Sequence, residues 1–310
     1  KNYYIMLYHD QRQILEISWW GADNAAVDAY SLKEQSASVV YPIVFRDGTF
    51  YAVIYDNSDA GLYNLSWIVS LLLGCAVLAL TQEYGLSARL TFSNCLLRPE
   101  HLIDRPCNAL CRAFSDSAGP QNGVIVHSEL LLTYLKKHYP RLYFVSSTTK
   151  VLTRFSQLRQ ELERDDFSYV VPDFRLNRSF AQLQALPQTL KDKTEFLCNE
   201  GCWSGCMERR ACYEAVSRKN LGAPGPEHRC TAPEAANGYR FSRAMEGPGF
   251  IGVQDIQTTY LPMGFSQFKI EGRGLGNALL LEFLLHYLTK PEYHLHVREA
   301  LYLDNTLDLF

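Results

Sequence analysis

The sequence lacks several features that would identify a common class of protein. A net charge of −3 over 310 residues gives no excess of basic residues, which argues against a dedicated nucleic-acid-binding surface. No Gly-rich dinucleotide or phosphate loop follows a strand-like run, which disfavours the nucleotide-binding folds built on such loops. Neither a Ser-His-Asp order nor a His-Glu-x-x-His motif is present, so two familiar peptidase classes are also disfavoured.

A membrane-length apolar run and a secretory leader are also missing. The longest apolar stretch, residues 65–80, has 16 residues, fewer than the ~20 that span a bilayer, so we expect a buried helix there. The first ten residues have no apolar run followed by a small-residue cleavage site. The nine cysteines are odd in number and clustered on a chain too large to need disulfide staples, which favours a cytoplasmic protein.

What the sequence does have is an alternation of strand-like and helix-like segments, supported by an apolar content of 47%. Strands separated by helical stretches are typical of parallel βαβ units. We therefore predict an α/β fold, a TIM-like (β/α) barrel in a single domain, 1–310, whose irregular N-terminal part, 1–60, contains two strand-like runs at 39–45 and 50–55. The barrel strands are expected at 88–94, 123–128, 141–147, 167–173, 193–198 and 265–272.

A cysteine-rich insertion, residues 199–250, is expected over the barrel mouth. Five of the nine cysteines lie within 33 residues, from Cys198 to Cys230. The later part of the insertion, 214–250, is rich in Gly and Pro and shows little apolar periodicity. Long loops of this kind in compact domains are usually functional lids or disordered segments.

The cysteine cluster allows three interpretations: a metal or iron–sulfur site, a disulfide cluster, or chance. Four thiolates are the common ligand set of iron–sulfur clusters and of structural zinc, and both metals stay open. The spacing matches neither the paired Cys-x2-Cys knuckles of zinc ribbons nor the ferredoxin run. The predicted ligands are Cys202, Cys206, Cys212 and Cys230, with Cys198 as the substitute for Cys212. Arg209 and Arg210 would either place positive charge beside the thiolates or be solvated helix residues.

Polar side chains follow several predicted strands, where a barrel collects its substrate-facing groups. Charged groups inside a barrel mouth usually pair with each other or bind an anion. An internal salt bridge of the last-strand cations with Glu271 or Glu200 is the alternative to anion binding. The predicted catalytic residues are Asp173, Asn199 and Glu200, and the predicted substrate-binding residues are Lys269, Arg273 and Asn177.

The last predicted strand carries Phe268-Lys-Ile-Glu-Gly-Arg273, which resembles a signature of the U32 family of collagenase-like peptidases. The resemblance covers roughly residues 86–290 and includes Asn199-Glu-Gly-Cys202. It implies a TIM-like barrel in which four cysteines hold a [4Fe-4S] cluster. It also implies oxygen-independent hydroxylation of an RNA or a small aromatic compound, with prephenate as co-substrate. The cysteine spacing departs from that of the family, which has a pair six apart and then a close pair.

Three functional hypotheses follow from these observations. The first is an iron–sulfur enzyme that hydroxylates or otherwise modifies an RNA, a peptide or a small aromatic substrate. The second is a peptidase of the U32 type, for which the sequence shows no convincing Cys–His pair. The third is a non-catalytic accessory or binding protein that uses a metal for folding. The expected partner is an anionic small molecule or a macromolecular substrate, and no membrane.

Overall fold

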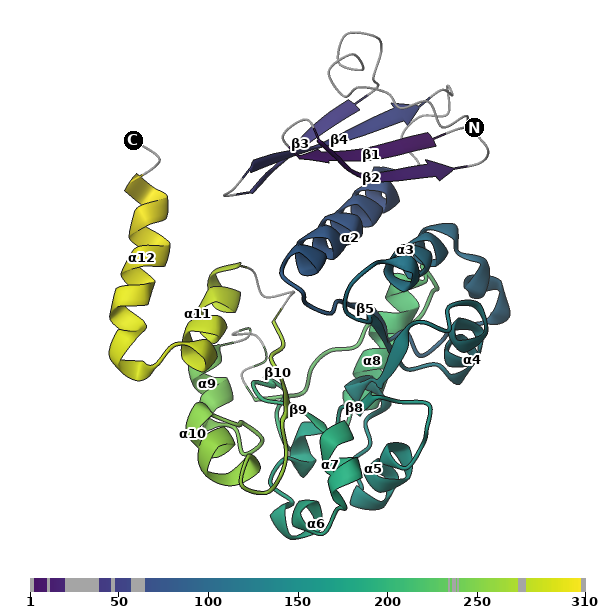
Figure 1. Ribbon diagram of the computed structural model, residues 1–310. Coiled ribbons are helices and arrows are strands. Elements are labelled where there is room, and N and C mark those ends of the chain that lie inside the picture. Colours follow the sequence, from purple (N-terminus) through teal and green to yellow (C-terminus); the bar gives the residue numbers. More distant parts are fainter. Residues whose placement is uncertain are drawn as a thin grey trace. The chain divides into compact units, whose positions relative to one another are not determined.

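The computed structural model describes residues 3–9, 12–19, 39–45, 48–56, 65–233, 235, 238, 240–272 and 277–307 (Figure 1). The chain divides into two compact units. Unit 1 comprises Lys1–Leu90, Arg98–Gly123 and Tyr134–Leu142, and unit 2 comprises Thr91–Leu97, Val124–Thr133 and Tyr143–Phe310. Each unit is described by itself.

Unit 1 begins with a four-stranded antiparallel sheet in the order β2-β1-β4-β3. In its register Tyr3 lies opposite Trp19 on one side and Asp56 on the other, while Phe45 lies opposite Gly48. The strands are β1 (Tyr3–His9), β2 (Arg12–Trp19), β3 (Val39–Phe45) and β4 (Gly48–Asp56).

This sheet corrects the expectation that residues 1–60 are irregular. The two strand-like runs at 39–45 and 50–55 are confirmed as the antiparallel pair β3 and β4. The strands at 3–9 and 12–19 were not predicted, because a short strand gains much of its stability from residues opposite it on its neighbours. Strand β1 pairs with its immediate neighbour β2 and also with β4, and the pairing with β4 joins segments distant in the sequence that a local pattern does not reveal. The single-domain boundaries stay a prediction.

The helices of unit 1 follow the sheet. The predicted helix near 65–84 is confirmed as α2 (Leu65–Glu83). It ends at Gly85, whose φ of +64° is a left-handed conformation that glycine adopts without steric cost. A 3₁₀ turn, Pro99–Ile103, precedes α3 (Arg105–Asp116), which packs against α2. No helix in the described part of the chain combines the length and the apolar character needed to cross a membrane.

The α/β class is confirmed by a series of strands with helices between them. Four strands lie in the order β5-β6-β7-β8, and β9 pairs with β10 in parallel. A single parallel bridge from Val170 to Thr194 connects the end of β8 to the residue before β9. The six strands are β5 (Arg89–Phe92), β6 (Gly123–Val126), β7 (Tyr143–Ser146), β8 (Tyr169–Val170), β9 (Glu195–Leu197) and β10 (Gln267–Lys269).

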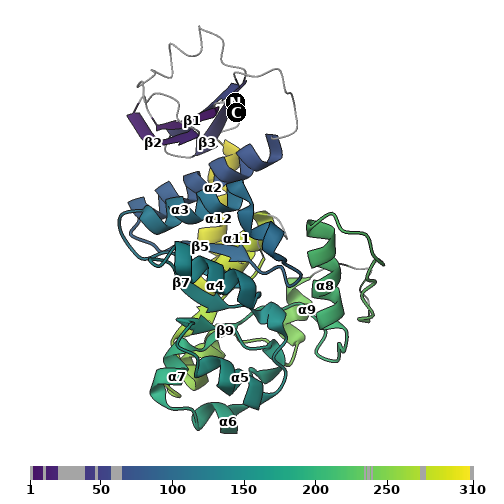
Figure 2. The ribbon, with the colours of Figure 1, turned by 90° about the vertical axis from the view of Figure 1, so that its right-hand side faces the viewer.

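Helices connect these strands, and α5 and α7 both contact β8 (Figures 1 and 2). The buried core between strands and helices is apolar: Ile125, Val145 and Leu197 on three of the strands form one cluster with Val171. Burial on both faces is typical of parallel strands. The connecting helices are α4 (Glu129–His138), α5 (Phe155–Leu162), α6 (Phe180–Gln184) and α7 (Gln188–Lys193).

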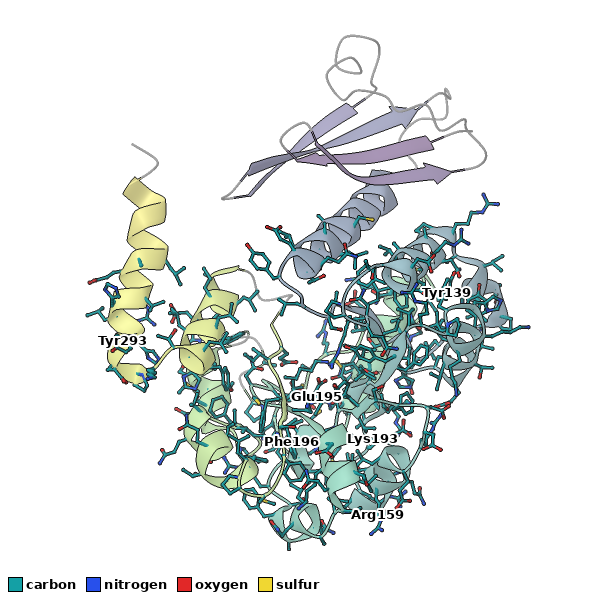
Figure 3. The ribbon with its side chains drawn as sticks, in the orientation of Figure 1. Tyr139, Arg159, Lys193, Glu195, Phe196 and Tyr293 are labelled. Atoms are coloured by element: carbon teal, nitrogen blue, oxygen red, sulfur yellow. The ribbon has the colours of Figure 1, made fainter. Side chains whose placement is uncertain are left out.

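Strand β9 lies at the centre of unit 2, where Figure 3 shows the side chains of Glu195 and Phe196. The ring of Phe196 is fully buried, with the rings of Tyr260 and Phe265 centred 4.9 and 5.0 Å away in edge-on geometry. This aromatic cluster fixes the strand that leads into the cysteines.

The remaining helices belong to unit 2. Helix α11 (Asn277–Leu288) comes after β10 in the sequence. The span 199–250 contains two helices, so it is more ordered than a bare loop, and its description as an insertion stays a prediction. The helices are α8 (Arg209–Asn220), α9 (Phe241–Glu246), α10 (Val253–Asp255) with a π-helical turn at Ile256–Tyr260, and α12 (His294–Leu307) after a 3₁₀ turn at Pro291–Tyr293.

Candidate functional site

Asp173 and Arg175 form the first charged pair beyond the strand ends of unit 2. Asp173 is fully buried three residues after β8 and begins the 3₁₀ turn η3 (Phe174–Leu176) by accepting a hydrogen bond from the Arg175 amide. The Arg175 guanidinium binds this carboxylate through two nitrogens, Nε at 2.6 Å and Nη2 at 2.9 Å. Its third nitrogen, Nη1, donates to the carbonyl of Cys206 at 2.7 Å. The pair therefore ties the cysteine loop, which we define as residues 199–208, to the end of β8.

Arg209, the first residue of α8, is the buried cation at the centre of the site. Its side chain is 2% exposed, and Nη2 donates to the Glu200 carboxylate. Its Nε lies 3.8 Å from the Asp173 carboxylate, a long ion pair without a hydrogen bond. Burial acts to lower the pKa of Arg209, but the charge and hydrogen bond of Glu200, together with Tyr213 and Cys202, outweigh burial and the pKa is raised.

Two donors of Arg209 have no acceptor. Nε and Nη1 are both buried, and within the described residues neither makes a hydrogen bond. A buried donor without a partner costs about 1–3 kcal/mol. The rings of Phe174 and Tyr213 lie 4.8 and 5.4 Å from the guanidinium carbon, so cation–π attraction offsets part of this cost.

Two carboxylates hold the start of the cysteine loop. Glu200 accepts a hydrogen bond from the Cys202 amide at 3.0 Å, and Glu271, two residues after β10, accepts from the Gly201 amide at 3.4 Å. Burial and then the nearby charge of Glu200 raise the pKa of Glu271 to about 7. The ends of β9 and β10 thus place two interacting carboxyl groups beneath the loop.

Two predicted polar residues bind backbone. The Asn199 side chain exchanges two hydrogen bonds with the backbone of Glu271, at 2.8 and 2.9 Å. Asn177 is fully buried, and its Nδ2 donates to the carbonyls of Leu197 and Gly249 at 3.0 and 2.7 Å. Both amides therefore stabilise the strand ends, and their assigned roles toward a substrate stay predictions.

The structure describes one of the two cations that were predicted on the last strand. Lys269 is the final residue of β10 and is half-buried, and its carbonyl accepts from the Cys198 amide at 2.9 Å. Arg273 lies outside the described residues. The catalytic assignments of Asp173 and Glu200 stay predictions, although the structure brings both carboxylates to the guanidinium of Arg209.

All nine cysteines are free, so no disulfide supports the disulfide interpretation of the cluster. Cys198 is fully buried at the end of β9, and burial raises its pKa to about 12, as expected for a core thiol. Cys212 lies on α8, where burial and then the neighbouring thiols of Cys230 and Cys206 raise its pKa. Those three thiols are therefore near one another.

Nearness does not amount to a formed metal site. Among the side chains that the structure describes, no three Cys, His, Asp or Glu residues are arranged to hold a metal ion. Cys202 and Cys230 are exposed, and Cys206 and Cys212 are half-buried. A metal bound by these four residues would require their side chains to be rearranged.

The sequence left Arg209 open between a positive charge beside the thiolates and a solvated helix residue, and it gave Glu271 only as an ion-pair partner of the last-strand cations. The signal for Arg209 was its position three residues after Cys206, beside a loop rich in thiols. Glu271 was visible only as one residue of the last-strand signature. What identifies both residues is their burial beside Glu200, which depends on contacts between distant segments.

Comparison with known proteins finds no matching family model, no matching curated protein and no matching solved structure. The U32 resemblance therefore rests on the residues quoted for it. Function has to be argued from the site itself.

Proposed function

We propose that this chain is an iron–sulfur-dependent enzyme of the U32 type, with its site at the carboxyl ends of the strands of a TIM-like barrel. The order of the strands supports the barrel. From β5 to β10 each strand follows its predecessor in space as in sequence, by direct pairing or by the bridge before β9. A doubly wound sheet would instead reverse this order at a switch point.

The observation that carries the functional proposal is the buried charge network joined to the cysteine loop. Three carboxyl groups and two guanidinium groups meet beyond β8, β9 and β10, and they bind the backbone of Gly201, Cys202 and Cys206. Burying a charged group costs free energy unless an opposite charge and hydrogen bonds compensate for the lost solvation. A loop held in this way is suited to present thiols over a strand-end site.

Two features make the residues suitable for a [4Fe-4S] cluster. Cys202, Cys206, Cys212 and Cys230 supply the usual number of thiolates. The unpartnered Nε and Nη1 of Arg209 need acceptors, and an anionic thiolate-bound centre next to α8 would provide them. When bound, the cluster would supply electron transfer or Lewis-acid chemistry. Zinc held by the same thiolates is the alternative.

The chain's own residues would bind and orient the substrate beside that centre. Arg209 would hold Glu200 in place, while Glu271, with a pKa of about 7, would hold or release a proton at its carboxyl group near neutral pH. The substrate would be an anionic small molecule such as prephenate with an aromatic acceptor, or an RNA or peptide. Reduced, clustered thiols support a cytoplasmic location.

The proposal is tested by the metal and acid-labile sulfide content of protein purified without oxygen. We expect about four iron and four sulfide per chain. Serine substitution at each of the four ligand cysteines should lower bound iron at least about tenfold. Cys107→Ser, at an exposed thiol of α3, is the matched control and should leave the iron content unchanged.

Other outcomes discriminate between the alternatives. Stoichiometric zinc without sulfide would favour a structural metal and the non-catalytic accessory protein. Peptide cleavage by metal-free protein would favour the peptidase. Protein that binds neither metal under anaerobic reconstitution would reject the proposal.

A further inference from the structure

A second polar cluster of unit 2 lies at the ends of β6 and β7. His127 directly follows β6, and the 3₁₀ turn η2 (Thr148–Lys150) follows β7. The His127 Nδ1 lies 2.8 Å from the Thr149 hydroxyl, which lies 2.9 Å from the hydroxyl of buried Ser147. This chain of hydroxyls engages Nδ1, so Nε2 is the ring nitrogen left for a ligand.

The backbone after this turn is strained. Val151 has a φ of +52° and is the one non-glycine residue with positive φ in the described segments. A β-branched residue rarely adopts this conformation, and strain of about 1–3 kcal/mol persists only where the surrounding contacts enforce it. Here Lys150 binds Glu161 at 2.6 Å and Glu129 at 3.0 Å, which fixes the turn. Such strain is often found at functional sites.

Four charged groups act on His127: Lys150 and Arg210 are positive, and Glu129 and Glu161 are negative. Burial first, and then the two cations, lower the pKa of His127 to about 4, so the ring is neutral at physiological pH. Lys150 is neutralised by its two carboxylates.

Arg210 differs from Lys150 in having no carboxylate partner within the described segments. It is exposed, and its Nη2 donates a 3.5 Å hydrogen bond to the carbonyl of Lys150. Helix α8, which carries Arg210, contacts the η2 turn. A positive charge free to pair therefore lies beside a neutral imidazole whose orientation is fixed.

We propose that Arg210 and His127 form an oxyanion-binding site, in which Arg210 binds a carboxylate or phosphate group of a ligand and His127 makes the second contact through Nε2. A guanidinium is a good donor to such groups, and His127 becomes a donor at Nε2 when its ring is protonated, because Nδ1–H donates to the Thr149 hydroxyl, which itself donates to Ser147. A bound oxyanion adds negative charge beside the ring and favours its protonated form. The site uses none of the cysteines. A negative result in its test therefore leaves the iron–sulfur proposal unaffected, and the reverse also holds.

The test follows the His127 ring signals by NMR in the full-length, isotope-labelled protein. Inorganic phosphate and malonate are titrated separately at constant ionic strength. We expect saturable shifts of the His127 signals and a rise of its pKa by about one unit when the site is occupied. The stronger of the two ligands tells whether the site prefers phosphate or carboxylate groups.

Variants distinguish ion binding at this specific site from a general effect of the added ions on the His127 signals. Arg210→Gln should weaken binding about tenfold, because it removes the charge-assisted contact. Lys219→Gln, at an exposed cation at the other end of α8, is the matched control and should bind like the wild type. Thr149→Val should also weaken binding, because it releases Nδ1.

Three results would overturn the proposal: shifts that fail to saturate, Arg210→Gln that binds both ions like the wild type, and His127 that titrates near 6.5. Arg210 is exposed and makes one long hydrogen bond, so its variant should stay folded.

Discussion

The guanidinium of Arg209 lies against the rings of Phe174 and Tyr213 and donates a hydrogen bond to Glu200. Its Nε and Nη1 have no acceptor among the residues that the structure describes. Single buried charges of this kind fix the strand ends of unit 2, because each holds a segment that is distant in the sequence. Removing one partner leaves the other charge buried and uncompensated.

Arg209→Gln is therefore expected to lower the free energy of unfolding by about 3–5 kcal/mol, since it leaves the Glu200 carboxylate, 6% exposed, without its cation. Urea denaturation of the full chain measures the change. The neighbouring variant Arg210→Gln, at an exposed position, should change stability by less than about 0.5 kcal/mol. The double variant with Glu200→Gln should be more stable than Arg209→Gln alone. Equal effects at 209 and 210 would contradict the buried pair.

His127 gives a residue-scale prediction for pH. Its folded pKa of about 4 lies below its unfolded value, so the unfolded chain binds more protons between about pH 4 and 6.5. Stability should therefore rise with pH across this window and should be fully gained above it. The expected contribution is about 1–3 kcal/mol.

The comparison of wild type with His127→Gln isolates this contribution, because other titrating groups act on both proteins. Thermal unfolding between pH 4 and 7 should show a shallower rise in stability for the variant. Parallel curves for the two proteins would mean that the ring is not held neutral.

At the scale of elements, close contacts between turns decide the local backbone. Gly249 lies against η3: a Cβ there would be 2.7 Å from a ring carbon of Phe174 and 2.8 Å from its carbonyl oxygen. The carbonyl of Gly249 also accepts a hydrogen bond from Asn177. This contact holds the segment after α9 against the turn that carries Asp173 and Arg175.

Gly249→Ala is expected to destabilise the protein by about 1–3 kcal/mol, because backbone atoms must move to admit the methyl group. Gly252→Ala is a matched control three residues away, where the nearest atoms to the added Cβ lie at 3.4 and 3.8 Å. Denaturant midpoints of the two variants provide the measurement. If the two alanine variants have the same denaturant midpoint, the close contact between Gly249 and η3 is wrong.

At the scale of the whole molecule, two strands and most of the cysteine loop differ in burial, because residues 201–208 are exposed or half-buried. Every residue of β6 and β9 is buried, whereas Met207 in the loop is 91% exposed. Local opening requires least energy where few apolar contacts are lost. The two regions should therefore differ in their protection from solvent.

Hydrogen exchange measured by mass spectrometry should be slowest in peptides covering β6, β7 and β9 and fast in residues 201–208. Anaerobic reconstitution with iron and sulfide should slow exchange in the loop and around Cys230 and leave the strand peptides unchanged, because the strands carry none of the four ligands. Loop exchange that is unaffected by bound iron would argue against ligands in this loop.

Much of the fold was predictable from the sequence because it depends on local patterns. The apolar run at 65–80 and the spaced strand-like segments predicted α2 and the strands β5 to β10. The strands β1 and β2 were missed: they pair with each other, and the sheet that contains them is completed by the pairing of β1 with the distant β4. For the site, the sequence indicated which residue types gather after β8 and β9.

By itself, then, the sequence determined the α/β class and the segment that holds the thiols, since periodicity and cysteine spacing are local properties. Tertiary structure decided which charges meet. Arg209 is the buried cation because β8 and β9 bring Asp173 and Glu200 to it. Asn177 donates a hydrogen bond to the carbonyl of Gly249, which is 72 residues away in the sequence. Burial and pairing of charge arise from long-range contacts, which no local pattern encodes.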